Sequence, residues 1–190
     1  MRFYIFSILF LTFSCSNPTM DTSSQGRSST DVVISTQHGD ITVALSDKAP
    51  NHKRAFIELV EAQFFDSLTI NRVIDGFVIQ GGCPDTEAGF SDSPHLIDPE
   101  FHDSLRHIYG AFGAGRDDNP QKRSAICQFY IVQNKEGISR LDGNYTIFGQ
   151  VVEGMDVVER IAKLDIDSID QPIEAVHMTC LLYTSDAADE

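Results

Sequence analysis

The chain has 190 residues, a formal net charge of −14 at pH 7, and 42% hydrophobic residues. This length and hydrophobic content suit one packed domain with terminal extensions. The negative charge argues against binding to nucleic acid, which requires a basic surface, and against adhesion to anionic lipid through surface charge. With 13 Phe and no Trp, the chain is expected to form a core rich in phenylalanine.

The N-terminal residues predict export. A positive start at Arg2 leads into an apolar run at residues 3–13, which is too short to span a membrane. Residues 1–14 are therefore predicted to be a signal peptide. The cysteine that follows resembles a bacterial lipoprotein cleavage site, so we expect a lipidated Cys15 and a flexible tether at residues 15–30. The alternative is an ordinary signal peptide with an incidental cysteine. On the first interpretation the protein lies outside the cytoplasm, on the periplasmic side of a bacterial membrane, and touches that membrane only through its lipid.

The first elements predicted after the tether are two strands and a helix. Residues 32–34 and 41–45 alternate as strands do, and residues 38–40 form the turn between them. A helix is predicted after Pro50, with one apolar face that must pack against a sheet. This face comprises Ala55, Phe56, Leu59, Val60 and Phe64.

A hairpin is predicted at residues 69–82, with the sequence TINRVIDGFVIQGG. Asp75-Gly76 between two apolar runs is a strong hairpin signal, and it predicts a type I′ turn. The alternative to a functional hairpin is a core hairpin whose arginine reaches out to solvent.

Three side chains of this hairpin are candidates for a common site. In a register with a two-residue turn, Arg72 and Phe77 share one face, while Gln80 lies on the other. A shared site then requires a bulge or twist in the ladder near Gly81-Gly82.

The rest of the chain predicts further short strands and one more helix. Residues 83–99 are punctuated by Pro, Gly and Ser, and loops of this length are often functional. A polar loop is predicted at residues 116–124 and a turn at residues 141–144. The remaining predicted elements are strands at 109–115, 127–133, 145–151 and 173–179, and a helix at 154–164.

About eight strands that do not alternate regularly with helices argue against a parallel sheet. We therefore predict a mainly β fold, a closed eight-stranded antiparallel barrel capped by two helices. Side chains fill the interior of a barrel of this size, so a binding site would lie on its outer surface.

Three blocks of sequence resemble one known family. They are TINRVIDGFVIQGG, then EFHDSLRHIYGAFGAGRDDNP with CQFYIV, and finally LDGNYTIFGQVVEGMDVVE. In this order they resemble the cyclophilins, the cyclophilin-type peptidyl-prolyl cis-trans isomerases. The resemblance covers about residues 32–179, so the domain is placed at 31–179, and it implies the same closed barrel.

The resemblance implies an enzyme that catalyses rotation about X-Pro bonds, here in exported proteins whose folding it assists. It implies a monomer that binds proline-containing peptides and unfolded exported proteins, and that needs no metal or cofactor. Arg72, Phe77 and Gln80 match the catalytic positions. The matched substrate-binding positions are Val78, Gly115, Arg116, Gln128, Tyr130, Leu141 and Tyr145.

The sequence departs from the family at several positions. Asn71 stands where His is common, Cys127 where Ser is usual, and Arg140 where some members carry Trp. None of these departures removes Arg72 or Gln80, so activity is still expected.

Two other functions are compatible with the residues. The first is a tethered, non-catalytic module or chaperone that binds prolyl peptides. The second is a metal-dependent hydrolase, since the chain has six His, and His102 and His107 lie near one another. No HExxH-type spacing supports the hydrolase.

Cysteines and the C-terminus give the last expectations. An exported compartment permits a disulfide between Cys83 and Cys127, but we expect two free or buried thiols. Residues 180–190, CLLYTSDAADE, resemble one reading frame of a transposase adapter used in short-read sequencing. The native last strand is then expected to end after about Thr179, with residues 181–190 packed against nothing. The alternative is a disordered acidic terminus.

Overall fold

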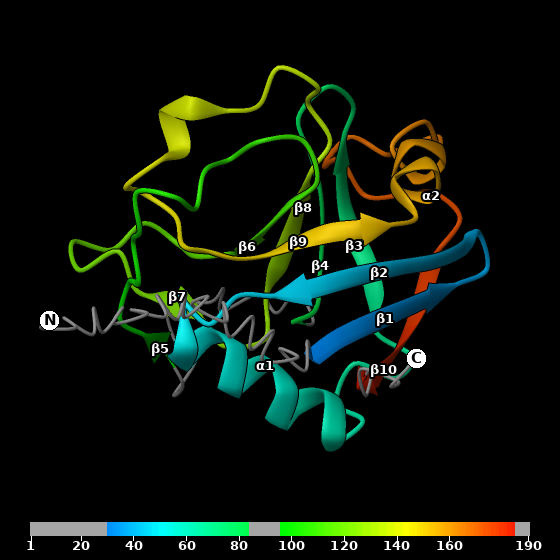
Figure 1. The fold of residues 1–190 in the computed structure, drawn as a ribbon. Coiled ribbons are helices and arrows are strands. Elements are labelled where there is room, and N and C mark those ends of the chain that lie inside the picture. Colours follow the sequence, from blue (N-terminus) through cyan, green and yellow to red (C-terminus); the bar gives the residue numbers. More distant parts are fainter. Residues whose placement is uncertain (1–29, 84–95, 185–190) are drawn as a thin grey trace, which may run out of the picture.

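The computed structural model describes residues 30–83 and 96–184. The predicted signal peptide, Cys15, most of the tether, most of the loop at 83–99 and the last six residues lie outside this range. A closed antiparallel barrel with the strand order β1-β10-β3-β4-β8-β6-β9-β2 forms the body of the molecule (Figure 1). Its strands are β1 (Thr30–Thr36), β2 (Gly39–Leu45), β3 (Thr69–Ile74), β4 (Val78–Gly81), β6 (Ala111–Ala114), β8 (Phe129–Val132), β9 (Ile147–Glu153) and β10 (Val176–Thr184).

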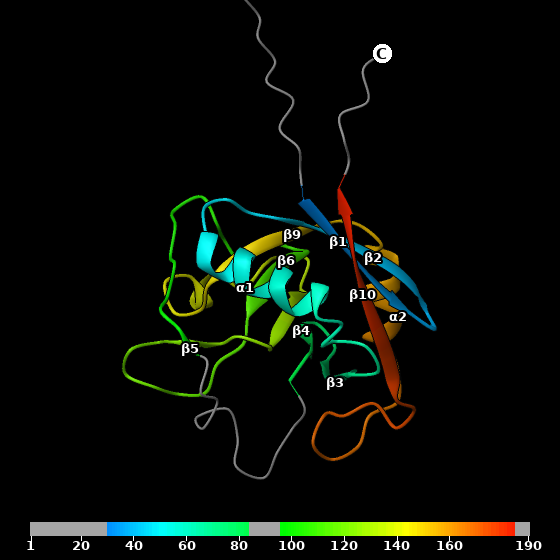
Figure 2. The ribbon, with the colours of Figure 1, turned by 90° about the horizontal axis from the view of Figure 1, so that it is seen from below.

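The predicted barrel is therefore confirmed, and its two helices lie at different places on it. The helix α1 (Pro50–Glu61) covers one end of the barrel, as the view from below shows (Figure 2), while α2 (Met155–Ile161) packs beside β2. The remaining elements are a short 3-10 helix, η2 (Ser139–Leu141), and a two-stranded sheet of β5 (Leu96–Ile97) and β7 (Ser124–Ala125) that was not predicted. None of the helices in residues 30–83 and 96–184 is long and apolar enough to cross a membrane.

The helix α1 begins at Pro50 itself, because the fixed φ of proline suits the first helical position. The helix ends at Glu61. Phe64, the last residue of the predicted apolar face, therefore lies beyond the helix and is 40% exposed. Phe56, at the centre of the buried face, meets Phe112 and Phe148 of the barrel strands at ring-centroid distances of 5.3 and 5.6 Å. The core is rich in phenylalanine, as predicted.

Alternation along the strands creates a second apolar cluster outside the barrel. On β8, Phe129 and Ile131 belong to the interior core, while Tyr130 and Val132 belong to the outer cluster. Successive side chains of a strand point to opposite faces, so each strand of this wall contributes to both layers. The outer cluster is the foundation of the site described below.

The predicted hairpin forms, but its turn and register differ from the prediction. Only Gly76 of the two turn residues has a positive φ (+74°), and the Phe77 amide donates to the Ile74 carbonyl at 3.0 Å. This fits a type II turn, not the predicted type I′ turn, which needs a positive φ at both positions.

Because β4 starts at Val78, three residues separate the strands and not the predicted two, and Arg72 lies opposite Gln80. The prediction that these two side chains face opposite ways is wrong. The ladder does shift register, between Ile70 and Arg72, but the three-residue connection is what places Arg72 and Gln80 on one face.

The last strand also differs from the prediction at both ends. Ile173 is 72% exposed and precedes β10, which starts at Val176. At the other end β10 continues to Thr184, and residues 178–184 pair with β1. Leu182 packs against the interior core, so the expectation that residues 181–190 pack against nothing is wrong for residues 181–184. Backbone groups make the ladder, and a strand can therefore extend without a particular side-chain sequence.

Cys83 and Cys127 form a disulfide with a Cα–Cα distance of 5.0 Å, within the usual range for such bonds. The expectation of two free thiols is therefore wrong. Sequence could not supply the distance, because the two cysteines are 44 positions apart in the chain. The bond joins the end of β4 to the segment that leads into β8.

Candidate active site

A pocket of about 250 Å³ lies on the outer wall of the barrel, above the outer apolar cluster. All ten residues predicted for catalysis and substrate binding line it, together with Asp117, which was not predicted. The lining residues are Arg72, Phe77, Val78, Gln80, Gly115, Arg116, Asp117, Gln128, Tyr130, Leu141 and Tyr145. One surface therefore collects residues from three separate blocks of the sequence.

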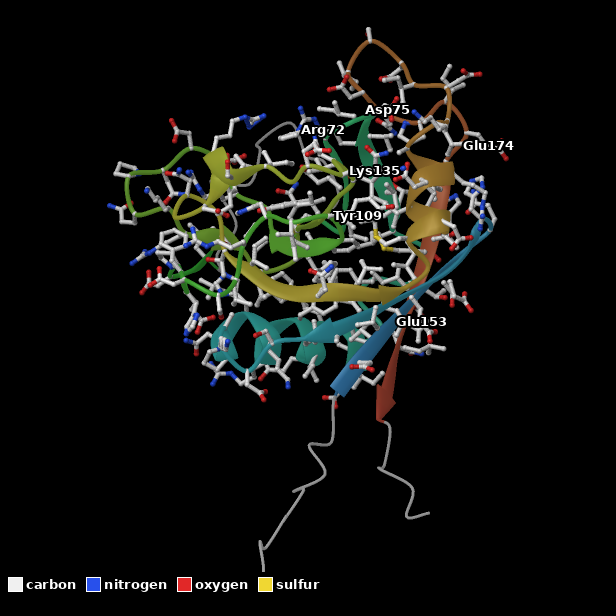
Figure 3. All side chains as sticks on the ribbon, turned by 45° about the horizontal axis from the view of Figure 1, so that its top comes forward. Arg72, Asp75, Tyr109, Lys135, Glu153 and Glu174 are labelled. Carbon is white, nitrogen blue, oxygen red and sulfur yellow. A yellow bond between two sulfur atoms is a disulfide. The ribbon has the colours of Figure 1, made fainter. Side chains whose placement is uncertain are left out.

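Arg72 extends from β3, and its side chain is 42% exposed. Figure 3 shows it on the side of the barrel where the loop between α2 and β10 projects. Its Nη2 atom lies 3.5 Å from Oδ2 of Asp170 in that loop. The arginine is therefore held by a carboxylate and remains accessible from the pocket.

The loop that carries Asp170 has its own internal order. The backbone amides of Ile169 and Gln171 donate to Asp167 Oδ1 at 2.9 and 3.0 Å. Asp170 has a φ of +66°, and its carbonyl accepts the Val73 amide of β3 at 2.8 Å. Sequence reasoning missed Asp170, because nothing in the local pattern shows that this loop reaches the residue next to Arg72.

A buried chain of hydrogen bonds lies beneath the pocket. The Tyr130 hydroxyl is 2.7 Å from Nε2 of His107, and Nδ1 of His107 is 2.7 Å from Oδ1 of Asp142. A carboxylate only accepts, so Nδ1 carries the proton and Nε2 accepts from the hydroxyl. Asp142 directly follows Leu141, and the chain therefore links the Tyr130 wall of the pocket to the Leu141 wall. The sequence offered His107 only as a doubtful metal ligand.

The pKa values of this chain favour a neutral histidine and an ionised carboxylate. Burial lowers the pKa of His107, although Asp142 opposes this change. Partial burial would raise the pKa of Asp142, but hydrogen bonds from the His107 ring and amide and from Arg106 outweigh it and lower the pKa. Burial raises the pKa of Tyr130 well above 10. Despite its likeness to a catalytic triad, the arrangement gives no accessible nucleophile, and it serves to hold Tyr130.

Gln128 lines the pocket and has an unpaired amide nitrogen that is itself buried. The residue is 4% exposed, and within the described residues its Nε2 atom has no hydrogen-bond partner. Gly115 makes room for this amide, since a Cβ there would lie 2.6 Å from Gln128 Cδ. Buried donors are nearly always paired, so a donor left free in a pocket is suited to a ligand carbonyl.

Two guanidinium groups lie over aromatic walls of the pocket. The Arg116 Cζ atom is 4.5 Å from the Tyr145 ring centroid, and Arg116 Nε also donates to the Asn144 carbonyl at 3.0 Å. The Arg140 Cζ atom is 4.9 Å from the Phe77 ring centroid. Both distances lie within the range of a cation–π interaction. In the described ranges, no group of three or more His, Cys, Asp or Glu side chains is placed to hold a metal ion.

Comparison with known proteins identifies the family. Residues 31–181 match the family described as "Cyclophilin type peptidyl-prolyl cis-trans isomerase/CLD". The chain belongs to this family. It is 34% identical over 146 residues to the peptidyl-prolyl cis-trans isomerase of Acinetobacter baylyi, covering 75% of this chain and 77% of the relative. It is 33% identical over 137 residues to peptidyl-prolyl cis-trans isomerase B of Escherichia coli, covering 68% and 82%.

The fold of the cyclophilin family is found in solved structures as well. The structure of a cyclophilin-type isomerase of Cryptosporidium parvum superposes with a TM-score of 0.72 at 22% identity, covering 83% of this chain and 99% of the other. At this identity the likeness concerns the fold alone. The activity of this cyclophilin is peptidyl-prolyl cis-trans isomerisation, which follows from the family match and the curated relatives.

Proposed function

We propose that this cyclophilin isomerises X-Pro bonds in exported proteins and so assists their folding, with Arg72 as the catalytic donor. The observation that carries the proposal is the accessible Arg72 guanidinium at the edge of a pocket with apolar and aromatic walls. These are the two features that the reaction requires.

The mechanism needs no covalent step. Amide resonance sets a barrier of about 18–20 kcal/mol to rotation of the X-Pro bond. A donor that bonds the prolyl nitrogen as its lone pair leaves resonance stabilises the twisted state more than the planar state. Arg72 is suited to this role because its guanidinium is always charged and has several fixed donors. Phe77, Tyr130 and Leu141 supply apolar surface for the prolyl ring.

The substrate backbone has separate partners in this proposal. Gln80 lies opposite Arg72 in the hairpin and is assigned to orienting the arginine and to contacting the backbone. The free Nε2 donor of Gln128 is assigned to a substrate carbonyl. The remaining members of the proposed peptide groove are Val78, Gly115, Arg116 and Tyr145.

The proposed location is the outer, periplasmic side of a bacterial membrane, with a lipid on Cys15. The N-terminal pattern supports this location. The Cys83–Cys127 disulfide supports it independently, because such bonds persist in oxidising compartments outside the cytoplasm.

Fractionation of cells that express the full chain tests the location. We expect the protein in the membrane fraction, with a mass increase on Cys15, and we expect a Cys15→Ser variant to remain an unlipidated precursor. Mature protein in the soluble periplasmic fraction with an unmodified Cys15 would refute the anchor.

The alternative role toward exported proteins is chaperone-like binding of their prolyl peptides, without catalysis of their folding. The ion pair of Arg72 with Asp170 favours it, since this pair engages the proposed donor in the free protein. Refolding of an exported protein with a slow proline-limited phase separates the two. An isomerase accelerates that phase at substoichiometric concentration, and its Arg72→Ala variant does not. A binding module gives no acceleration with either form.

A further inference from the structure

Of the twelve lysines and arginines in the described part of the chain, nine have a carboxylate oxygen within 4.0 Å, and Arg140, Lys122 and Lys48 do not. Within the described part of the chain, every other arginine has a carboxylate oxygen within 4.0 Å of its guanidinium. The chain carries 28 acidic residues against 14 basic ones, so a carboxylate partner is easily found. An exposed arginine without one therefore requires an explanation.

Arg140 lies at the mouth of the prolyl pocket. It belongs to η2 beside Leu141, and its guanidinium covers the ring of Phe77 at 4.9 Å. Within the described residues the Arg140 guanidinium donates no hydrogen bond. Its donors then stay available for a second partner, and a planar fork of donors matches a carboxylate.

A second positive charge lies on the same turn. Lys122 Nζ donates to the Gly143 carbonyl and to Asn144 Oδ1, each at 2.9 Å. No carboxylate among the described residues lies within 4.0 Å of it. The side-chain amide nitrogen of Asn144, Nδ2, in turn donates to the Arg140 carbonyl at 3.3 Å. Arg140 of this turn, at residues 140–144, and Lys122 bound to it therefore both lack a carboxylate partner among the described residues, while the carboxylate of Asp142 in the same turn is held by Arg106 and His107.

We propose that the surface formed by Arg140 and Lys122 at the edge of the pocket is a subsite for a carboxylate. The enzyme then prefers prolines flanked by Asp or Glu. This inference rests on the proposed function, because it names the peptides that the same pocket selects. Arg140 is a specificity residue that binds the side chain next to proline, and Lys122 adds to the local positive potential.

Paired peptides test the preference in the full-length protein. The pairs are Ala-Glu-Pro-Phe with Ala-Gln-Pro-Phe, and Ala-Ala-Pro-Glu with Ala-Ala-Pro-Gln. Exchange NMR gives kcat/KM, and chemical-shift titration gives Kd. We expect the Glu member of at least one pair to be favoured about fivefold at low salt, the size of an exposed ion pair, and the preference to shrink as salt is added.

Arg140→Gln and a matched control identify the residue responsible. In Arg140→Gln the kcat/KM for the Glu peptide should fall toward the kcat/KM for the Gln peptide, so that the ratio of the two values approaches one. Arg54→Gln changes the net charge equally, on the exposed face of α1, and should keep the preference. Equal loss for both peptides in Arg140→Gln would mean that Arg140 only supports the Phe77 wall, and it would overturn the proposal.

The outcomes separate this inference from the proposed function. If the Gln peptides are isomerised and the Glu peptides gain nothing, the subsite is wrong while the isomerase stands. If no peptide is isomerised, the proposed function fails, and the Kd ratio still decides the subsite. A Glu preference in Kd that Arg140→Gln removes supports it, and equal Kd values refute it.

Discussion

Arg72 carries a permanent charge on a mainly apolar hairpin, and only Asp170 compensates it among the described residues. Arg72→Ala should lower kcat and kcat/KM on an X-Pro peptide together, by about a hundredfold, since the bond to the prolyl nitrogen forms in the transition state. The free energy of unfolding should fall by no more than about 1 kcal/mol, because the ion pair is exposed. Arg72→Lys should recover little activity, since an ammonium lacks the planar fork. Exchange NMR and urea denaturation measure both effects. Full activity in Arg72→Ala would refute the assignment.

The buried pair of His107 and Asp142 links stability to pH. Burial lowers the pKa of His107 from 6.5, so the folded protein binds fewer protons there than the unfolded chain. The contribution of His107 to the free energy of unfolding is fully present above pH 6.5 and is lost as pH falls through the lowered pKa of His107. The lowered pKa of Asp142 acts in the same direction below pH 3.8.

We therefore expect the free energy of unfolding to fall between pH 7.5 and pH 5.5. His107→Gln should be less stable at pH 7.5, because Tyr130 loses its partner, and should show a smaller decrease. His52, whose pKa burial also lowers, leaves some pH dependence in the variant. Denaturation curves of both proteins at the two pH values measure this decrease. An identical decrease in the natural chain and in His107→Gln would contradict a role of His107 in the pH dependence.

The hairpin of β3 and β4 shows which structure local sequence can and cannot determine. Asp75-Gly76 predicted the hairpin correctly, because a glycine between apolar runs favours reversal. The type of turn depends on the φ of Asp75, which the sequence does not reveal. That one difference changed the register and placed Arg72 opposite Gln80. The ten residues matched to the family through three sequence blocks all line one pocket, whereas local pattern alone placed two of the three proposed catalytic residues, Arg72 and Gln80, on opposite faces.

The loop between α2 and β10 positions Arg72 through Asp170, and its charge can be removed without changing its backbone. Asp170 has a positive φ, which Asn tolerates better than Ala does. Asp170→Asn should lower kcat by about fivefold, equivalent to about 1 kcal/mol, and leave KM nearly unchanged. Steady-state kinetics measure kcat and KM separately. Increased activity would instead mean that Asp170 holds the arginine away from substrate.

Long-range contacts explain what the sequence did not predict. Asp170, His107 and Asp142 reach the site from loops remote in the sequence from the hairpin, and each depends on how those loops pack against the barrel. The pairing of Cys83 with Cys127 has the same cause. Periodicity reports the layers of the barrel, but it carries no information on which loops meet.

The disulfide constrains the whole chain through a loop with a sequence separation of 44 residues. Replacing both Cys83 and Cys127 with Ser should lower the free energy of unfolding by about 2–4 kcal/mol, chiefly because the unfolded chain gains freedom. Burial raises the pKa of the Cys180 thiol to about 12, so this cysteine contributes little thiolate for exchange with the disulfide. Urea denaturation with and without reductant tests this. Reductant should destabilise the natural chain and leave the double variant unchanged.

Closure of the barrel depends on the end of the chain. Residues 181–183 of β10 lie opposite Val33, Val32 and Asp31 of β1, and Leu182 packs against the interior core. A chain truncated after Thr179 exposes part of the β1 edge and the core beneath Leu182. It should lose roughly 2 kcal/mol of unfolding free energy relative to a chain truncated after Thr184, the size of one buried leucine.

Substitution at the same positions separates the backbone ladder from its side chains. Leu181 is 61% exposed, so Leu181→Thr should change stability by less than about 0.5 kcal/mol, since threonine also suits a strand. Leu182→Ala should account for most of the loss caused by truncation. If the two truncated chains unfold at the same urea concentration, residues 180–184 do not complete the barrel, and re-sequencing the gene past Thr179 becomes the deciding experiment. If they differ as expected, a segment that resembles an adapter can still supply a strand, because β1 offers it backbone partners and the core beneath it accepts a leucine.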